Sequence, residues 1–449
     1  MRRPPRPAHG SAGASPTRFC AALAILLWAA AAGAQGPSEK TLSECLAMAL
    51  DHHPSLKAAG AAVDAAHQRV WQAASGYLPQ INAAYSLDRS MTSLGASTGT
   101  DVDPQSSTFT FHETGASFSQ RLFDFGKTLA DIRGAQASQR SVDADRATQR
   151  ETVVLSVKQS YYQLLAAQRL RVVAEDTVRQ NRAQTALAEG RNQVGLAPRF
   201  DVTRARVQLA QAELDQLTAR NNVQLARETL RNAIGLTAPL DFDIVDTLEA
   251  ARVQIGETQA LQTAYDSRPE LASILAQQNA VEQQVASLQR DYLPYVTGNG
   301  GYFWSGTWNG SEVPYEDSWN IGAAVNLSLF NGGLTTAQVG EAKANLSRLR
   351  YDEDTLRQNI ALAVRQALLN AQQASESIGV AEKGAQEARE SLELAEGRYE
   401  TGVGNIIELT DAQTARTSAE ARAVQALYDY QTSLAELERA MGQALAREP

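Results

Sequence analysis

The sequence predicts a mixed α and β membrane protein, in which long coiled-coil-like helices predominate and four short strands enter a membrane. Three observations lead to this class. They are an N-terminal export segment, a tandem duplication, and the succession of long proline-free stretches and short strands of period two. Because of the duplication, each element is expected twice, in the order helix, strand, loop, strand, helix.

The N-terminus has the pattern of a secretory signal. Residues 1–18 are basic, residues 19–33 are apolar, and the run ends at Ala34 in the small-x-small form of a cleavage site. The apolar run is shorter than the roughly 20 residues that a membrane-spanning helix needs. We therefore predict a signal peptide over residues 1–34.

The composition argues against a nucleic-acid partner. The 449 residues carry a net charge of −9 and have an isoelectric point near 5.3, whereas phosphate binding needs basic patches. The aromatic content is only 6%, and alanine, glutamine, arginine and glutamate are abundant, which favours long helices in narrow contact. Cys45 is the only cysteine outside the signal, and we expect it to be a small buried hydrophobe.

The rest of the chain consists of two tandem copies of one sequence pattern. The pentapeptide LAEGR begins at Leu187 and again at Leu394, an offset of 207 (394 − 187). Nearer the start of each copy, Pro54 corresponds to Pro269 with an offset of 215 (269 − 54). The change of offset falls between the two strands, so the first copy has the longer insert there. We predict a first repeat over 35–236, a linker over 237–260 and a second repeat over 261–449.

Each copy predicts two strands after a helix that ends at the motif YLP. Proline cannot continue a helix, so Pro79 and Pro294 mark the change to extended chain. From Trp319 to Leu329, apolar residues alternate with small polar ones, which is typical of outer-membrane strands about ten residues long. A water-soluble sheet with one core face would show the same alternation. The predicted strands are 80–90, 108–123, 295–308 and 316–330.

The second strand of the first copy is irregular. Its alternation slips near His112–Gly115, which predicts a bulge or an early turn at that point.

Two stretches are predicted to be unusually long helices. Proline is absent from Lys127 to Arg191 and from Leu334 to Tyr399, and about 65 residues at 1.5 Å each would extend roughly 98 Å. Each ends near LAEGR, and a shorter helix returns with apolar residues at alternating spacings of three and four. The repeated LAEGR thus marks two hairpin tips. Structural turns are expected at Pro54, Pro79, Gly126, Pro269, Pro294 and Gly333.

The signal, the two copies, the YLP entries and the Val-Gly-Leu tip at 194–196 resemble the TolC-family outer-membrane efflux proteins over residues 35–449. The resemblance implies a homotrimer in outer-membrane lipid, with a twelve-stranded β-barrel and a periplasmic α-barrel. It implies a passive exit duct that docks a periplasmic adaptor protein and an inner-membrane RND or ABC transporter. The implied docking positions are Gly190, Arg191, Val194, Gly195, Leu196, Gly397, Arg398, Gly402 and Val403.

The second tip also carries additional acidic residues. Glu390, Glu393 and Glu400 lie with Gly397 on one stripe with spacings of three, four and three, and alanine stands at the first-copy positions of the first two acids. We hypothesise that these acids line the lumen at a gate, where cations or arginines such as Arg179 or Arg182 would offset their repulsion. A solvated outer helix face is the alternative.

Signals of enzymatic chemistry are weak throughout. None of the five histidines has a metal-ligand partner at a convincing spacing, so we expect no enzyme, no cofactor and no metal site. The rival to an exit duct is a structural periplasmic coiled-coil or adaptor protein without a membrane barrel. Drugs, peptides and proteins all remain open as cargo.

Overall fold

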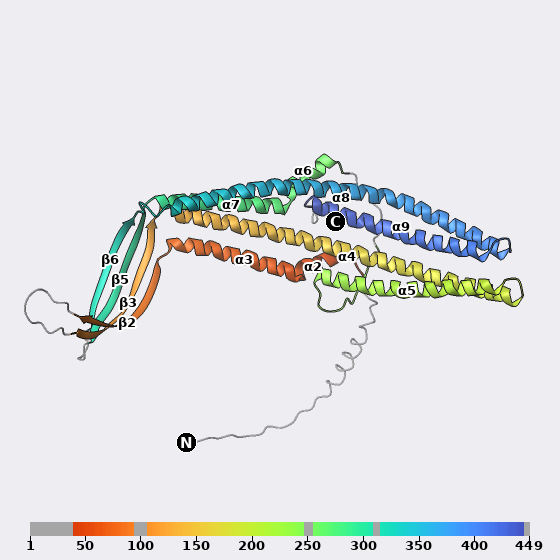
Figure 1. Cartoon of the computed structure of the whole chain (residues 1–449), viewed down its shortest axis with the longest axis horizontal. Coiled ribbons are helices and arrows are strands. Elements are labelled where there is room, and N and C mark those ends of the chain that lie inside the picture. Colours follow the sequence, from red (N-terminus) through yellow and green to blue (C-terminus); the bar gives the residue numbers. More distant parts are fainter. Residues whose placement is uncertain (1–38, 94–105, 247–254, 309–314, 444–449) are drawn as a thin grey trace, which may run out of the picture.

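The computed structural model describes residues 39–93, 106–246, 255–308 and 315–443. The predicted signal peptide and part of the predicted linker lie outside these residues. The strands gather at one end of an elongated molecule, and two helical hairpins extend to the other end (Figure 1). Among the helices of the described ranges, none combines the length and the apolar character needed to cross a membrane.

Four antiparallel strands form one sheet with the order β2-β3-β5-β6. Their register places Ile81 opposite Phe118, Phe118 opposite Gly300, and Gly300 opposite Ile321, which makes one face of the sheet apolar. The adjacent row contains asparagine, serine and glycine, so the other face is polar. The strands are β2 (Gln80–Ser93), β3 (Ser106–Phe123), β5 (Tyr295–Trp308) and β6 (Glu316–Asn326).

The irregularity predicted at His112–Gly115 is wrong. Strand β3 pairs without interruption through these residues, and the register shift lies between Arg121 and Phe123. The sequence pattern slips because β3 has phenylalanines on both faces: Phe111 lies on the polar face, opposite Asp88, and Phe118 lies on the apolar face, opposite Ile81. Strand β6 also ends four residues before the predicted residue 330, because Asn326 pairs with Tyr295, the first residue of its partner β5.

Each copy has one 67-residue helix, and at 1.5 Å per residue each is about 100 Å long. Gly126 and Gly333 precede these helices with φ of 83°, a conformation that favours glycine at a sharp strand-to-helix change. The long helices are α4 (Lys127–Gln193) and α8 (Leu334–Glu400), and the returning helices are α5 (Arg199–Ile234) and α9 (Ile406–Ala440).

Short helices approach the sheet in both copies. Pro54 and Pro269 are the first residues of α3 and α7, where the missing backbone N–H has no helical partner to lose. A 3-10 turn follows each helix, and Pro79 and Pro294 then lie directly before β2 and β5. The helices are α2 (Leu42–His52), α3 (Pro54–Ala74), α6 (Glu257–Ser267) and α7 (Pro269–Gln289).

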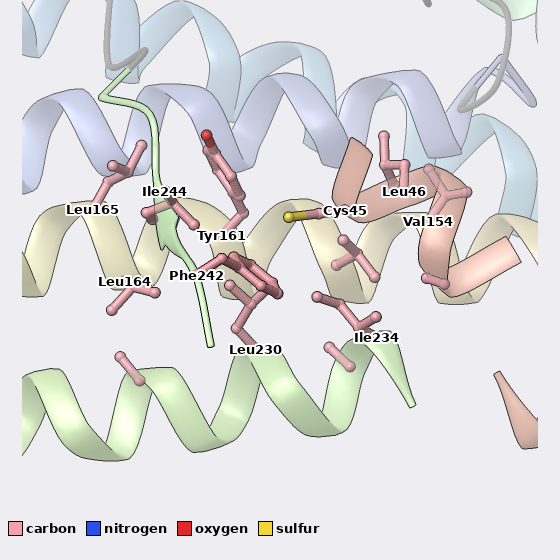
Figure 2. Packing of buried hydrophobic residues seen from close by; sticks show 14 of the residues in the cluster. Cys45, Leu46, Val154, Tyr161, Leu164, Leu165, Leu230, Ile234, Phe242 and Ile244 are labelled. Carbon is pink, nitrogen blue, oxygen red and sulfur yellow. The ribbon is translucent and has the colours of Figure 1, made fainter. Parts of the chain in front are cut away.

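The largest core lies midway along the molecule, around Tyr161 of α4 (Figure 2). Its hydroxyl donates to the carbonyl of Val245 at 2.8 Å and to that of Lys40 at 3.3 Å. Lys40 belongs to β1 (Glu39–Lys40), which pairs with β4 (Asp243–Ile244) in a small parallel sheet, and Val245 directly follows β4. The buried Tyr161 thus ties the start of the described chain to the segment between the repeats.

Candidate functional site at the helical tips

The first tip is a tight turn stabilised by its own backbone. Gly195 has φ of 75°, and the N–H of Leu196 donates to the carbonyl of Arg191 at 2.8 Å, which satisfies the helix end. The side chain of Asn192 closes the loop by donating to Ala197 O at 2.8 Å. The turn holds Val194 and Leu196 in solvent, 69% and 72% exposed.

The second tip repeats this geometry with different residues. Gly402 has φ of 78°, and the N–H of Gly404 donates to the carbonyl of Arg398 at 2.8 Å. Asn405, which the sequence reasoning missed, accepts from the N–H groups of Ile407 and Glu408 and caps α9. The Val403 side chain is 73% exposed, so both tips present an aliphatic residue beside a left-handed glycine.

The two LAEGR segments lie within the last turns of the long helices rather than in the loops. Gly190 and Gly397 are helical, and a Cβ added at either would meet no atom within 4 Å. Arg398 pairs with Glu408 at 2.8 Å across the second hairpin.

Arg191 joins the two tips of one chain. Its guanidinium donates to the carbonyl of Tyr399 and lies 4.9 Å from the centroid of the Tyr399 ring. Burial and the nearby charge of Asp201 raise the pKa of Tyr399, and Arg191 opposes them. We call Arg191 and Tyr399 the tip clasp. Arg191 is therefore engaged within the chain, in addition to its predicted place on a docking surface.

Further polar contacts follow the tip clasp along the seam between the hairpins. Arg204 of α5 donates to Thr410 at 3.1 Å, and Gln184 of α4 donates to Glu396 at 3.4 Å. The apolar contacts near the tips lie mainly within each hairpin, as in the cluster of α8 and α9 around Leu409. Separating the two hairpins along their polar seam therefore exposes less apolar surface than separating the two helices of one hairpin.

The three predicted gate acids are exposed in the single chain. Glu390, Glu393 and Glu400 lie on the side of α8 that turns away from its buried seam with α9, and Glu390 accepts from Gln386 of its own helix at 2.9 Å. The arginines expected to offset them pair with other residues within the chain. Arg179 pairs with Asp176 at 2.5 Å, and Arg182 pairs with Glu213 at 2.8 Å.

Glu396 is an acidic residue of this region that the sequence reasoning missed. Burial raises its pKa, with contributions from the charges of Glu400 and Glu393, while the hydrogen bond from Gln184 and the charge of Arg416 lower it. Glu396 was not distinguished because the first copy has Glu189 at the same place, so comparison of the copies reveals no added charge.

An antiparallel sheet with one apolar face, continued by helices about 100 Å long, defines a class of proteins: subunits of outer-membrane channels with a periplasmic helical extension. The chain belongs to the outer membrane efflux protein family, whose sequence model matches residues 45–236 and 260–443. Among the described residues, no group of three or more His, Cys, Asp or Glu side chains could hold a metal ion.

Known proteins agree with this assignment over nearly the whole chain. It is 25% identical to the outer membrane protein TolC of Vibrio cholerae, covering 90% of this chain and 91% of that protein. It is 25% identical to the alkaline protease secretion protein AprF of Pseudomonas aeruginosa, covering 87% and 82%. The structure of the Campylobacter jejuni CmeC outer membrane channel has a TM-score of 0.76 at 17% identity, covering 98% and 94%.

The predicted fold class of long helices, four antiparallel strands and a two-part repeat is confirmed. The protein is an outer-membrane efflux channel of the kind that serves tripartite efflux and type I secretion systems, and it is a transport protein rather than an enzyme. The alternative of a periplasmic coiled-coil or adaptor protein without a membrane part is wrong.

Proposed function

We propose that three copies of the chain close into one duct, with a twelve-stranded barrel in the outer membrane and a helical barrel in the periplasm. The observation that carries this proposal is that, within the described ranges, both lateral edges of the sheet are unpaired. Strands β2 and β6 end the sheet, and four strands cannot close a barrel, for which about eight is the usual minimum. A head-to-tail ring would pair β6 of one copy with β2 of the next.

The helical edges support the same arrangement. In the tip half, α4 and α9 lie in the middle, and α5 and α8 lie at the edges. Each edge helix has a stripe of aliphatic side chains that are more than half exposed, which a neighbouring copy would cover. The stripes are Val207, Leu214, Leu217 and Leu225 on α5, and Leu362, Leu369, Val380 and Leu394 on α8.

Cross-linking between these edges tests the ring. We would place cysteines at Leu217 and Val380 in a Cys45→Ala chain, because Cys45 is the only free thiol of the described residues. Leu217 and Val380 are the matched pair of the two stripes, 18 (217 − 199) and 20 (400 − 380) residues from the tip ends of α5 and α8. A bifunctional thiol reagent should give dimers and trimers of the detergent-purified protein and no larger species. A monomer that stays soluble without detergent would refute the proposal.

We further propose that the exposed tip residues dock a periplasmic adaptor, which connects the duct to an inner-membrane transporter of the RND or ABC class. Val194, Leu196 and Val403 are aliphatic and exposed on rigid turns, which suits a small apolar contact of low entropic cost. Leu196→Asp and Val403→Asp should reduce adaptor cross-linking in cells without reducing trimer yield. Unchanged cross-linking in both variants would contradict docking at the tips.

For the acidic stripe, we propose that Glu390 and Glu393 of three subunits face the lumen near the tips and favour cations. Glu390→Lys with Glu393→Lys should reduce cation selectivity in single-channel recordings. Asp354→Lys is the matched control, because Asp354 is exposed on the same helix but lies 36 residues (390 − 354) before the stripe, far from the tips. Unchanged selectivity in the double variant, or an equal change in the control, would leave the stripe as a solvated outer face.

A further inference from the structure

Four charged side chains with little solvent exposure meet where the two repeats join. Glu151 lies in the half of α4 that is nearer the sheet, Arg268 and Glu270 lie at the start of α7, and Arg439 lies in the last turn of α9. We call these residues the equatorial charge cluster. The exposed fractions of the Glu151, Arg439 and Glu270 side chains are 7%, 16% and 23%. With so little water available, the charges must be balanced within the cluster.

The two carboxylates are held differently. Arg439 Nη2 donates to Glu270 Oε1 at 2.6 Å. Arg439 Nη1 lies 3.1 Å from Glu151 Oε2, but neither atom makes a hydrogen bond within the described residues. Glu270 therefore has a charge-assisted hydrogen bond, whereas Glu151 has a cation nearby without the hydrogen bond that would favour its ionised form.

Because of these differences, Glu151 binds a proton more readily than Glu270 does. Burial raises the pKa of Glu151 to about 7, with Arg439 and Arg268 opposing the shift and Glu270 adding to it. Burial also acts to raise the pKa of Glu270, but the hydrogen bond from Arg439, a backbone hydrogen bond and the two arginines lower it overall. Arg268 is buried as well, and burial lowers its pKa.

The other groups around this part of α4 are engaged elsewhere. On the α3 side, Gln149 donates to the hydroxyl of Ser55 at 3.0 Å, and the Nδ1 atom of His53 lies 2.7 Å from the same hydroxyl. Two turns further along α4, Lys158 pairs with Glu438 of α9 at 2.8 Å. The charges that act on Glu151 are therefore those of the equatorial charge cluster.

The internal repeat provides a natural comparison. Gly235 and Gly442 occupy matching places, and each touches the backbone that leads into a short helix. A Cβ on Gly235 would lie 2.9 Å from His53 Cα, and one on Gly442 would lie 2.9 Å from the carbonyl carbon of Ser267. None of the residues at the positions that match the four cluster residues in the other copy is an arginine or a carboxylate. The matching pairs are Arg268 and His53, Glu270 and Ser55, Arg439 and Asn232, and Glu151 and Gln358. The same backbone contact therefore forms without the four charges, so the charges are not required to build it.

We infer that the equatorial charge cluster is a proton-binding joint, in which Glu151 holds a proton while α4, α7 and α9 are packed together and releases it when they separate. On separation the O–H bond of the carboxylic acid breaks, the proton goes to water, and the carboxylate is solvated. Helices α4 and α9 run from this joint to the first and second tips (Figure 1). The inference goes beyond the proposed function, because it requires neither a partner protein nor a cargo.

The expected pH dependence has a definite sign. The pKa of Glu151 is higher in the packed protein, about 7, than its ordinary value of 4.5. A group of this kind stabilises the packed state fully below the ordinary pKa, and that stabilisation is lost as the pH rises to the packed-state value. Acid should therefore tighten the joint. The ratio of packed to separated molecules should fall by up to about tenfold per pH unit between about pH 5 and 7.

Thermal unfolding of the detergent-purified mature protein across this pH range tests the joint. Wild type should lose stability as the pH rises, and Glu151→Gln, which resembles the protonated acid, should lose much less. Glu420→Gln is the matched control, because Glu420 is a buried α9 carboxylate paired with Arg389 and Arg416 at 2.8 and 3.0 Å. The inference is overturned if Glu151→Gln keeps the wild-type slope, or if Glu420→Gln loses the slope equally.

A second measurement applies if Glu151→Gln does not fold. Infrared difference spectra of the wild type should show a protonated carboxyl band that disappears near the pKa of about 7. A wild-type protein with no carboxyl band in that range would overturn the inference. Neither experiment depends on the number of subunits or on pump docking, so failure of the proposed function would be seen separately.

Discussion

Removal of Arg191 should allow the two tips of one chain to separate. Its guanidinium donates to the Tyr399 carbonyl and stacks 4.9 Å from the ring centroid of that residue. A hydrogen bond from a charged donor contributes about 1.5–3 kcal/mol, and a partly exposed cation–π contact contributes about 0.5–1 kcal/mol. Arg191 is half-buried, so we take the lower values. Arg191→Ala should then weaken the tip clasp by about 2 kcal/mol, which is roughly a 30-fold change in the ratio of joined to separated tips.

Distances between spin labels at the two tips provide the assay. Val194 and Val403 are 69% and 73% exposed, so labels at these positions should not disturb packing. Labelled chains would be diluted with unlabelled ones, so that the distance within one subunit dominates. Wild type should give one narrow distribution, and Arg191→Ala should add a longer distance. Arg191→Lys should lie between them, because it keeps the charge and loses the planar stacking group.

The control variant removes an arginine from the same tip without touching the seam. Arg206 pairs with Glu189 at 2.7 Å, and both residues belong to the first hairpin. Arg206→Ala should therefore leave the distance distribution unchanged. A wild-type distribution in Arg191→Ala, or equal broadening in both variants, would refute the reasoning that the tip clasp joins the hairpins.

Two further predictions concern the sheet and the core. A Cβ on Gly301 would lie 2.6 Å from Phe303 Cζ, so Gly301→Ala should cost about 1–3 kcal/mol in denaturant unfolding, and adding Phe303→Ala should recover most of this loss. If the double variant recovers no stability, the loss in Gly301→Ala does not come from contact with the Phe303 ring. Tyr161→Phe removes the hydroxyl that bonds Val245 and Lys40, so it should cost about 1–3 kcal/mol and speed amide exchange in β1 and β4. Unchanged amide exchange would show that the hydrogen bonds of the Tyr161 hydroxyl do not stabilise this small sheet.

The sequence was sufficient to predict the architecture because the architecture is periodic. Long proline-free stretches, alternating strands and a constant offset between the copies are each read from many residues at once, so local exceptions do not hide them. One exception, in β3, misled the prediction of a bulge. Phe111 and Phe118 lie on opposite faces of an uninterrupted strand, and in the sequence this change of face looks like a slip of register.

The contacts that join the hairpins could not be predicted in this way. Arg191 and Tyr399 lie 208 residues apart (399 − 191), and no local pattern connects them. Sequence reasoning therefore placed Arg191 on a docking surface and did not find its second role. It also missed Glu396, whose environment depends on Gln184 of a different helix.

The duplication separates residues that build the frame from residues that have acquired other roles. Glycines with positive φ recur at matching places: Gly126 and Gly333 both have φ of 83°, and Gly195 and Gly402 have 75° and 78°. A position that keeps the same backbone conformation in both copies is explained by that conformation alone. The equatorial charges differ between the copies although the backbone contact is the same, so backbone geometry does not explain them. Burying charged side chains costs free energy unless the charges balance one another. Because the matching site forms without such charges, they are not required for folding. Differences between the copies at such matching sites are therefore where control of the duct should be sought.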